Sequence, residues 1–456
     1  MRLHDPGRIL LVSCYELGHQ PLGLAWPRAF LERAGYAPAC LDLAVEPLDE
    51  EMIARAGLVA VAVPMHTALR IGVAFARRVR VINPACFVCF YGLYATLNAD
   101  VLLSGLADAV IGGEVEERLV TLARQVESRE AVEVRRAPLE RLTFPVPARQ
   151  GLPDLHRYVH FARNGTTVPA GYVEASRGCL HLCLHCPIPP VYGGRFFAVP
   201  RDIVLADIRQ LVAGGARHIT FGDPDFLNGP AHALKLARAL HAEFPEVSFD
   251  CTTKIEHILE HRALVPELAA LGCAFVVSAV ESTSDAVLRE LAKGHTKADI
   301  ETALAITREA GITLRPSFVA FTPWTTLEDY VAMLEFVDAR DLVLDVDPVQ
   351  YAIRLLVPPG SGLLTQGAMR AFLGPLDAER FTYRWTHPDP RMDALHQRVT
   401  GIVEAAARRQ TPAGDTFERI VEAALAARGE RSRRWATRGA PRIPPASPRL
   451  TEPWFC

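Results

Sequence analysis

Three cysteines lie close together near the middle of the 456-residue chain, in a Cys-x3-Cys-x2-Cys arrangement at Cys179, Cys183 and Cys186. They come directly after an apolar segment, so the pattern predicts three thiolates on one short loop that follows a strand. Three thiolates can hold three irons of a 4Fe-4S cluster and leave the fourth iron open to a ligand that is not protein. An open iron indicates chemistry at the cluster rather than electron storage alone.

Two other uses of clustered cysteines fit this spacing less well. Structural zinc takes four protein ligands, usually as two short pairs well separated in sequence, although His181 and His185 could complete such a site. A disulfide is disfavoured because the long chain shows no secretory signature at its beginning. We therefore expect reduced thiols, with the clustered cysteines used for metal and the scattered ones packed in cores.

Composition places the chain among ordinary globular proteins. Half of its residues are hydrophobic and 22% are charged, and its length predicts about two to four domains. The formal net charge of -3 provides no basic field for nucleic acid. No apolar run is long enough to span a bilayer. We expect a cytoplasmic protein without a nucleic-acid or membrane partner.

The first third of the chain alternates short apolar runs with helical periods, which predicts a doubly wound parallel sheet of the Rossmann type over residues 1–134. Ligands of such sheets lie outside the carboxyl ends of the strands. Met65, His66, Gly92 and Gly113 fall on loops at those ends. The expected strands are residues 8–14, 36–43, 58–63, 86–91 and 109–111, with a helix over residues 68–83.

Two histidines and two cysteines in this part have open roles. His19 and His66 lie on ligand-side loops, so each either contacts a cofactor or is an ordinary surface-loop residue. Cys86 and Cys89 form a Cys-x2-Cys, but they lie in an apolar strand, which favours buried core positions. No Gly-x-Gly-x-x-Gly follows the first strand, and its absence argues against a dinucleotide.

The middle of the chain is expected to form a second α/β domain. Residues 135–165 lose periodicity and accumulate proline, which predicts a linker. Residues 166–358 then repeat strand-helix units that predict a partial (β/α)6 barrel, whose active site lies at the carboxyl ends of its strands, where Cys179 falls. The expected strands are residues 172–175, 218–221, 248–252, 275–279, 314–321 and 345–352.

The last hundred residues carry less information. Residues 359–428 are expected to be mainly helical, with helices over residues 391–409 and 417–427. Residues 429–456 are rich in Arg and Pro and end in Cys456, which predicts a tail that is disordered or bound to a groove.

Over residues 168–355 the cysteine loop and the strand ends resemble the radical S-adenosylmethionine (radical SAM) superfamily. The resemblance implies a 4Fe-4S cluster whose open iron is chelated by S-adenosylmethionine, and reductive cleavage to a deoxyadenosyl radical. It also implies cofactor contacts at Gly222 and Asp223 for the methionine amino group, at Lys254, and at Glu281 for the ribose hydroxyls. His185 departs from the family, since many members have an aromatic residue there.

Each of these strand ends also has a purely structural interpretation. Asp223-Pro-Asp225 could simply shape a turn. Ser282 to Ser284 could cap a helix, and Thr326 is expected to cap the helix that follows it.

The N-terminal domain resembles the cobalamin-binding domain that precedes the catalytic domain in the cobalamin-dependent branch of this superfamily. The resemblance covers roughly residues 8–130 and rests on Met65-His-Thr-Ala68, Gly92-Leu-Tyr-Ala-Thr96 and Gly113-Glu-Val-Glu-Glu117. The Asp-x-His-x-x-Gly stretch by which many cobalamin domains supply a histidine to cobalt is absent. The corrin is then either bound without that ligand, or the pocket has lost it.

The resemblance implies an enzyme that performs radical methyl transfer or a related radical modification. Its substrate, a small molecule or peptide, is unknown, and its electron donor would be a flavodoxin or ferredoxin. The alternative is a non-catalytic iron-sulfur electron carrier or regulator. The ending at Cys456 also resembles a subfamily whose tails finish in Cys-Cys-Ala-Glu-Pro or Cys-selenocysteine-Ala-Glu-Pro, which would make Cys456 a redox residue beside a misread selenocysteine codon, or else an incidental terminal cysteine.

Overall fold

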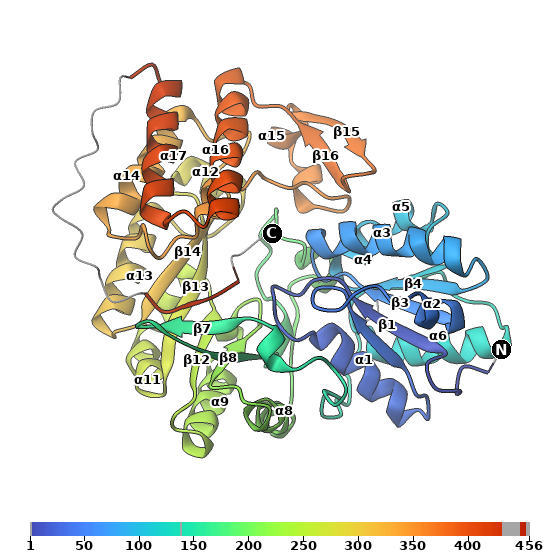
Figure 1. Ribbon diagram of the computed structural model, residues 1–456. Helices are drawn as coiled ribbons and strands as arrows, with labels where there is room; N and C mark the ends of the chain where they lie inside the picture. Colours follow the sequence, from blue (N-terminus) through green and yellow to red (C-terminus); the bar gives the residue numbers. More distant parts are fainter. Residues whose placement is uncertain (1, 137–138, 431–446, 453–456) are drawn as a thin grey trace.

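The computed structural model describes residues 2–136, 139–430 and 447–452. The chain forms an N-terminal α/β part and a larger, curved α/β part that lie side by side, and a C-terminal region packs on the larger part (Figure 1). Among these residues, no helix combines the length and the apolar character that crossing a membrane requires.

The N-terminal part is a doubly wound sheet of six parallel strands in the order β2-β1-β3-β4-β5-β6. Helices α1 and α6 pack together on one face, and α2 and α3 pack together on the other. This arrangement explains why β1 and β3 are buried along their whole length. The strands are β1 Ile9–Ser13, β2 Ala39–Asp42, β3 Leu58–Ala62, β4 Phe87–Tyr91, β5 Ala109–Ile111 and β6 Arg135–Arg136; the helices are α1 Leu22–Arg33, α2 Glu50–Arg55, α3 His66–Ile82, α4 Leu93–Leu97, α5 Ala99–Leu103 and α6 Glu116–Ser128.

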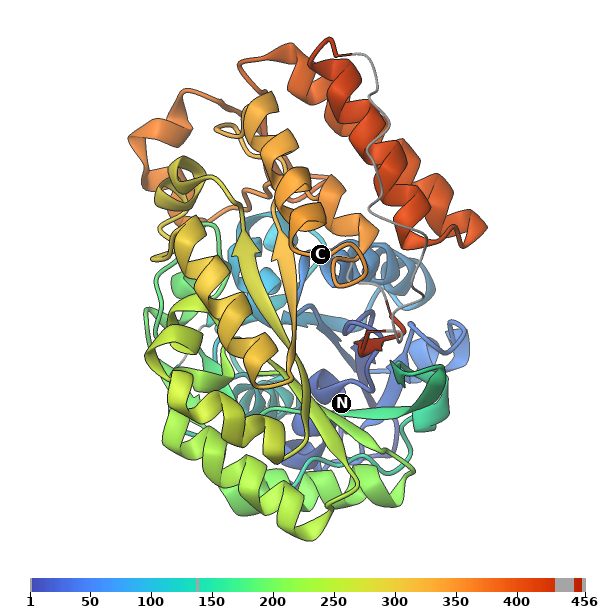
Figure 2. The ribbon, with the colours of Figure 1, turned by 90° about the vertical axis from the view of Figure 1, so that its left-hand side faces the viewer.

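The larger part is a curved seven-stranded sheet in the order β14-β13-β12-β11-β8-β7-β17. Five of its strands are parallel, and β7 and β17 add to one edge in antiparallel pairing. Figure 2 shows these strands with green and yellow helices on their outer side. The strands are β7 His160–Arg163, β8 Thr166–Val173, β11 His218–Phe221, β12 Ser248–Thr252, β13 Cys273–Glu281, β14 Thr313–Phe318 and β17 Arg449–Leu450; the helices are α8 Arg201–Ala213, α9 Pro230–Glu243, α10 Ile255–Glu260, α11 Val265–Ala270, α12 Asp285–Glu290, α13 Lys297–Glu309 and α14 Leu327–Ala339.

The expectation of a sixth barrel strand over residues 345–352 is wrong. This segment contains the 3-10 helix η4 (Pro348–Ala352), and an isolated bridge between Phe321 and Arg354 is what remains of the pairing. Pro348 has no N–H to give to a ladder. Asp347 pairs with the Arg315 side chain across the barrel interior instead.

Other boundaries also differ from expectation. The segment expected as a linker contains β6 at its start and β7 near its end, and each pairs with one of the two sheets. The C-terminal region contains the hairpin β15 (Leu373–Asp377) and β16 (Thr382–Trp385) before the two expected helices, α16 (Pro390–Arg409) and α17 (Ala413–Ala427). Thr326 caps α14 as predicted, in a capping box with Asp329.

The described end of the tail is bound to the barrel. Strand β17 pairs with β7, and the backbone N–H of Thr451 donates to the carbonyl of His160 at 2.8 Å. Of the two expectations for the tail, disorder or binding to a groove, residues 447–452 follow the second. Cys456 lies outside the described residues.

A buried arginine in the connection between the sheets joins both parts. Arg149 Nε donates to Asp207 Oδ1 on α8 at 2.6 Å, and its Nη1 donates to Gln20 Oε1 in the loop after β1 at 2.9 Å. Its Nη2 donates to the carbonyl of Tyr172 on β8 at 2.6 Å. The guanidinium thus satisfies groups from the N-terminal loop, a barrel helix and a barrel strand at once.

The contacts of Arg149 with Gln20, Tyr172 and Asp207, called the Arg149 clamp from here on, predict that two charge-removing substitutions differ strongly in their effect on stability. Asp207→Asn leaves the buried Arg149 charge without its partner, so we expect the free energy of unfolding to fall by about 3–5 kcal/mol. The control is Glu243→Gln, which removes the partner of Arg209 in an exposed pair, and it should leave the unfolding midpoint nearly unchanged. Urea unfolding measures both, and equal effects would contradict the clamp.

Candidate active site

The three cysteines lie on the loop that leaves the first parallel barrel strand. After β8 the chain forms the short strand β9 (Ser176–Gly178), which pairs with β10 (Phe196–Ala198), and the cysteine loop follows. Cys179 and Cys183 are buried and Cys186 is half-buried, and none of the three is in a disulfide. Helix α7 (Pro189–Tyr192) ends the loop.

Gly178 and Asn228 shape this loop. Gly178 has φ +78°, and a Cβ atom there would lie 2.3 Å from the carbonyl oxygen of Arg195, so glycine is required where the loop begins. The side-chain oxygen of Asn228, which follows β11, accepts from the backbone N–H of Leu180 at 3.2 Å and lies 3.8 Å from Cys179 Sγ. Sequence reasoning missed Asn228, because a lone asparagine after a strand carries no signal of its partner.

The chemistry of the cysteine loop fits a cluster better than a single zinc ion. Among the described residues, no cysteine belongs to a group of three or more His, Cys, Asp or Glu side chains whose ligand atoms all lie within 4.8 Å of one another. One tetrahedral zinc ion would bring its sulfur ligands within about 4 Å of each other. Burial raises the pKa of Cys186 to about 12, so the binding of a metal by this thiol would release its proton.

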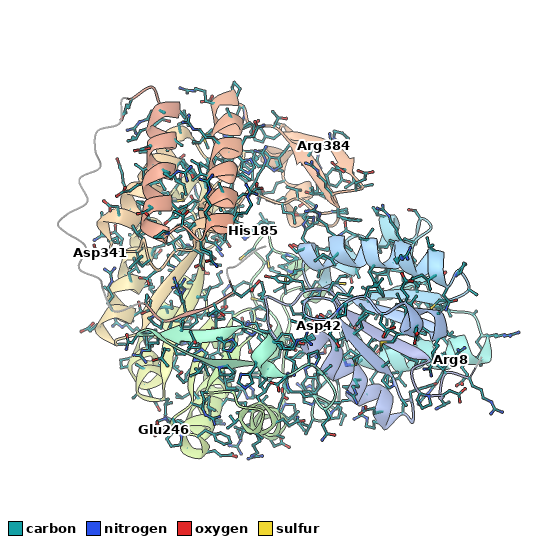
Figure 3. All side chains as sticks on the ribbon, viewed as in Figure 1. Arg8, Asp42, His185, Glu246, Asp341 and Arg384 are labelled. Carbon is teal, nitrogen blue, oxygen red and sulfur yellow. The ribbon has the colours of Figure 1, made fainter. Side chains whose placement is uncertain are left out.

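The two histidines of the loop contact other partners. His181 Nε2 lies 3.3 Å from His257 Nε2 and 3.6 Å from Asp225 Oδ2, and so points to the ends of β11 and β12. His185 Nε2 lies 3.1 Å from Glu281 Oε1. Figure 3 places His185 near the centre of the molecule, close to where the two α/β parts meet. Neither histidine therefore joins the cysteines as a fourth zinc ligand in this arrangement.

Glu281, at the end of β13, is held in a buried ionic cluster. Lys293 Nζ lies 3.3 Å from Glu281 Oε1, the same oxygen that His185 contacts. Burial by itself would raise the pKa of Glu281, but the charges of Lys293 and His185 outweigh it and lower the pKa to about 2. The backbone of Glu281 has φ +65°, an uncommon and strained conformation for a residue with a side chain.

Asp223 and Asp225 at the end of β11 have different partners. Asp223 accepts from the hydroxyl of Ser176 and from the backbone N–H of Ala175, and burial raises its pKa to about 7. Asp225 caps the short 3-10 helix η2 (Phe226–Asn228) and accepts from Thr253 Oγ1 at 2.7 Å. Asp225 thus shapes the turn, while Asp223 joins this turn to the segment that leads into the cysteine loop.

Lys254, predicted as a cofactor contact at the end of β12, is buried and pairs with Glu256. Ser282, in the segment considered as a helix cap, accepts from the backbone N–H of Ser284 at 3.1 Å. No side chain caps α12 at Ser284. Ser282 to Ser284 therefore form a local turn and do not cap helix α12 with a side chain.

A cavity of 430 Å³ lies between the two α/β parts. On the N-terminal side it is bounded by the strand-end loops, and on the barrel side it reaches Gly178 and Ile188, which flank the cysteine loop. Of the residues predicted at the strand ends, Met65, Gly92 and Gly113 line it, and Gly222 lines it from the barrel.

His66 differs from Met65, its neighbour in sequence. His66 begins α3 and its Nε2 lies 2.7 Å from the carbonyl oxygen of Arg380, in the C-terminal region, so it does not line the cavity. His19 is buried, which makes its surface-loop interpretation wrong. Cys86 and Cys89 are buried core residues, as expected.

Arg177, two residues before Cys179, locks the barrel to the N-terminal sheet. Its guanidinium pairs with Glu116 at 2.7 Å, with Glu114 at 3.1 Å and with Glu174 at 2.9 Å. It also lies over the rings of Trp26 and Phe144, at 5.5 and 5.0 Å from their centroids. Sequence reasoning missed this residue, because its partners are brought to it only by the packing of the two sheets.

Comparison with known proteins agrees with this geometry. The family model of the radical SAM superfamily matches residues 173–337. An uncharacterized methyltransferase of Pyrococcus horikoshii is 25% identical over 367 residues, which cover 74% of this chain and 76% of the relative. The ribosomal protein uS12 methylthiotransferase RimO of Geobacter sulfurreducens is 27% identical over 194 residues, but the match spans 41% of that relative.

Two solved structures share the fold of both parts. The cobalamin-dependent S-adenosylmethionine radical enzyme OxsB, with aqua-cobalamin and S-adenosylmethionine bound, superposes with a TM-score of 0.70 at 14% identity, over 88% of this chain and 67% of OxsB. The radical S-adenosylmethionine methyltransferase TsrM from Kitasatospora setae, with cobalamin and a [4Fe-4S] cluster bound, gives a TM-score of 0.60 at 19% identity, over 73% of this chain and 70% of TsrM. This chain therefore carries a radical SAM domain, in the fold of cobalamin-dependent radical SAM enzymes.

The ionic cluster of Glu281 predicts a pH-dependent contribution to stability. Because its folded-state pKa of about 2 lies below its ordinary value of 4.5, the carboxylate stabilises the fold above pH 4.5, and this contribution is lost as the pH falls toward 2. Glu281→Gln lacks it throughout. We expect the difference in urea midpoint between the metal-free wild type and Glu281→Gln to be larger at pH 7 than at pH 4. A difference that grows on acidification would contradict the assignment.

Proposed function

We propose that this protein is a radical SAM enzyme that holds a 4Fe-4S cluster at Cys179, Cys183 and Cys186, binds S-adenosylmethionine at the open iron, and binds cobalamin between its two α/β parts. The reaction is radical methyl transfer or a related radical modification of a substrate. The observation that carries the proposal is that Gly178 and Ile188, which flank the cysteine loop, are also walls of the interdomain cavity.

When bound, the cluster would supply the electron that cleaves the sulfonium, and the corrin would supply a methyl carrier. The residues of this chain position these groups. Gly178 and Asn228 hold the cysteine loop, and Arg177 keeps it against the N-terminal sheet. We place Glu281 at the ribose hydroxyls of S-adenosylmethionine, because a carboxylate can accept hydrogen bonds from both hydroxyls of a diol.

The interdomain cavity has the walls that a flat corrin requires. Apolar side chains from strand-end loops, such as Met65 and Leu93, line it next to the aromatic rings of Trp26 and Tyr91. Gly92 has φ +107°, and a Cβ atom there would lie 3.1 Å from the carbonyl oxygen of Val63, so this loop end stays without a side chain. Among the described residues that line the cavity there is no histidine, which supports corrin binding without an imidazole from the protein.

The relatives support methyl chemistry in particular. The Pyrococcus horikoshii relative is named a methyltransferase and RimO a methylthiotransferase, and TsrM is a methyltransferase of the same fold. We further propose a flavodoxin or ferredoxin as the electron donor, in the cytoplasm, where thiols stay reduced.

Anaerobic reconstitution tests the first part of the proposal. Protein supplied with iron, sulfide, S-adenosylmethionine and a low-potential reductant should form deoxyadenosine. Cys179→Ala, Cys183→Ala and Cys186→Ala should each reduce its formation to background, because three thiolates are needed to hold the cluster with one open iron. Cys273→Ala, at a buried cysteine on β13, is the matched control. An intact cluster without deoxyadenosine would establish an electron carrier or regulator instead.

Substitutions at the neighbouring residues Met65 and His66 test whether cobalamin binds in the interdomain cavity. Met65→Trp fills the cavity and should weaken the binding of hydroxocobalamin by about tenfold or more, because a bound macrocycle needs that space. His66→Ala should leave the affinity nearly unchanged, since His66 faces Arg380. Absorbance titration measures both dissociation constants. A large loss in His66→Ala with none in Met65→Trp would place the corrin elsewhere.

A further inference from the structure

A second cavity, of 230 Å³, lies inside the curved sheet. Four separate parts of the chain form its walls: the barrel strands with the loops after them, the loop after β1, the end of the cysteine loop and the C-terminal segment. The lining residues include Thr220, Asp250, Thr252, His19, Ile188, Leu450 and Glu452. We call this space the barrel cavity.

The barrel cavity adjoins the interdomain cavity. Both are lined by Leu17, Tyr172, Ile188, Gly222 and Pro224. A molecule in the barrel cavity therefore lies beside the end of the cysteine loop and beside the space proposed for the corrin. If the proposed function holds, on which this inference rests, a substrate held here lies next to both cofactors.

A buried histidine in the wall of the barrel cavity has a ring nitrogen without a hydrogen-bond partner among the described residues. His19 is 3% exposed, and its Nδ1 makes no hydrogen bond to the described residues. Its ring is tilted against that of Tyr172, with the centroids 4.6 Å apart. Burial lowers the pKa of His19 to about 3, so the imidazole is neutral. Buried polar groups are nearly always hydrogen-bonded, so the imidazole indicates a ligand that supplies its partner.

The charged side chains of the barrel cavity are acidic. Asp250 is buried, and its Oδ1 accepts from His218 Nε2 at 2.8 Å and from Thr220 Oγ1 at 2.6 Å. Glu452 accepts from the hydroxyl of Tyr15 at 3.0 Å. Among the described residues that line this cavity there is no lysine or arginine.

Glycine allows the C-terminal segment to bring its carboxylate here. Gly18 has φ +72°, and a Cβ atom there would lie 2.8 Å from Glu452 Cγ. The segment can therefore pack directly on the loop after β1. Pairing of β17 with β7 fixes the register that places Leu450 and Glu452 in the cavity wall.

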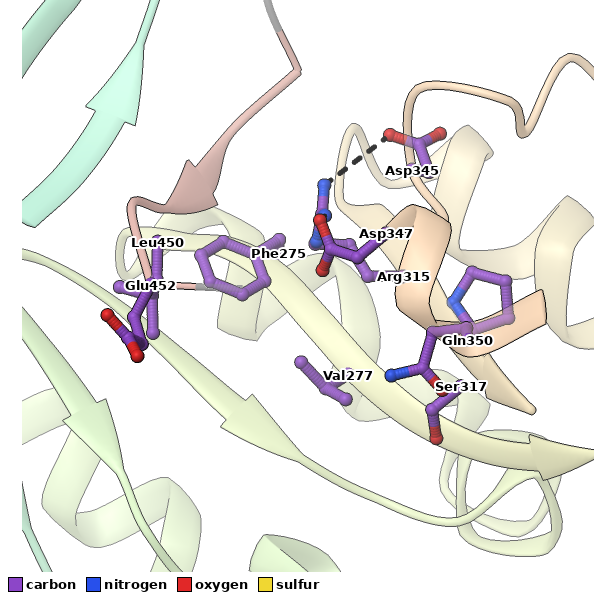
Figure 4. Close-up of a pocket in the computed structure, with 10 residues that line it drawn as sticks. Phe275, Val277, Arg315, Ser317, Asp345, Asp347, Gln350, Leu450 and Glu452 are labelled. Carbon is purple, nitrogen blue, oxygen red and sulfur yellow. Dashed lines mark hydrogen bonds and ion pairs between the residues drawn. The ribbon is translucent and has the colours of Figure 1, made fainter. Parts of the chain in front are cut away.

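The basic residue of the adjoining cavity already has acidic partners. A small neighbouring cavity shares Val277, Leu450 and Glu452 with the barrel cavity, and Arg315 is the one basic residue among the described residues that line it. Arg315 Nη2 donates to Asp347 Oδ1 at 3.2 Å. Its Nη1 lies 4.0 Å from Asp345 Oδ1, and a dashed line marks this ion pair in Figure 4. The positive charge of Arg315 is thus offset, and does not offset Asp250 or Glu452.

We propose that the barrel cavity binds a substrate that carries a protonated amine or guanidinium group, with Asp250 and Glu452 as the carboxylates that recognise the cation and His19 as a hydrogen-bond partner for a neighbouring polar group. Opposite charges that are partly buried attract more strongly than opposite charges in solution do. Apolar walls from Leu17, Phe221 and Val277 suit the uncharged part of such a substrate. The C-terminal segment is then part of the substrate site.

Three probes with one benzene ring and a short arm test the charge preference: phenethylamine, 2-phenylethanol and phenylacetate. They are titrated calorimetrically into the full chain with its reconstituted cluster and hydroxocobalamin, without reductant. We expect phenethylamine to bind about tenfold more tightly than 2-phenylethanol, with phenylacetate the weakest. Equal affinities, or tightest binding of phenylacetate, would overturn the proposal.

Charge-neutral variants locate the cation. Glu452→Gln and Asp250→Asn should each reduce the preference for phenethylamine over 2-phenylethanol by about fivefold, because each removes one carboxylate and keeps its shape. Glu243→Gln, on the outer helix α9, is the matched control and should keep the full preference. If Asp250→Asn does not fold, Glu452→Gln decides alone, because Glu452 lies on a peripheral segment. A preference that is unchanged in Glu452→Gln would remove Glu452 from the site and overturn the proposal.

The two proposals fail in different ways. Formation of deoxyadenosine without a preference for the amine would overturn the cationic substrate and leave the radical SAM function intact. A preference for the amine without deoxyadenosine would overturn the enzymatic function, while the cavity would still bind cations.

Discussion

The way the two α/β parts pack against each other depends on one buried guanidinium, that of Arg177. Arg177 follows the first barrel strand, two residues before the first cysteine, and it pairs with Glu114 and Glu116 from the loop and helix after β5. Burial raises the pKa of Glu114, so its carboxylate is costly to keep charged without a cation beside it. Because a buried charge must be paired, this contact holds the cysteine loop of one α/β part against the strand ends of the other.

The pairing of Arg177 with Glu114 and Glu116 sets how the two α/β parts face each other. The carboxyl ends of two parallel sheets, each the usual ligand-binding edge of its fold, face a common space. The interdomain cavity and the barrel cavity share walls there, and the cysteine loop borders both through Ile188. Arg149 adds a second tie, farther from the loop, through Gln20 and Asp207. A rigid frame of this kind suits radical chemistry, in which reacting groups must be held in place.

Two residues, Glu281 and His19, are held in arrangements that the fold alone does not need. Glu281 has a left-handed backbone conformation at the point where the pairing of β13 with β14 shifts register. The imidazole of His19 is buried without a hydrogen-bond partner among the described residues. Strain and unsatisfied polar groups persist where the surrounding structure enforces them, and they concentrate at functional sites. Glu281 ends β13, and His19 lies in the loop after β1, where it lines the barrel cavity.

The sequence by itself determined the local chemistry: the cysteine spacing, the order of most strands and helices in both parts, and the strand-end positions of Met65, Gly92 and Gly222. These follow from periodicity and turn residues, which act over short distances along the chain. Only the tertiary structure decided which neighbours meet. Met65 faces the cavity and His66 turns to Arg380, residues 348–352 form a 3-10 helix instead of a strand, and Arg177 and Glu452 find partners far away in sequence. Such choices depend on packing and charge pairing between distant segments, which no local pattern encodes.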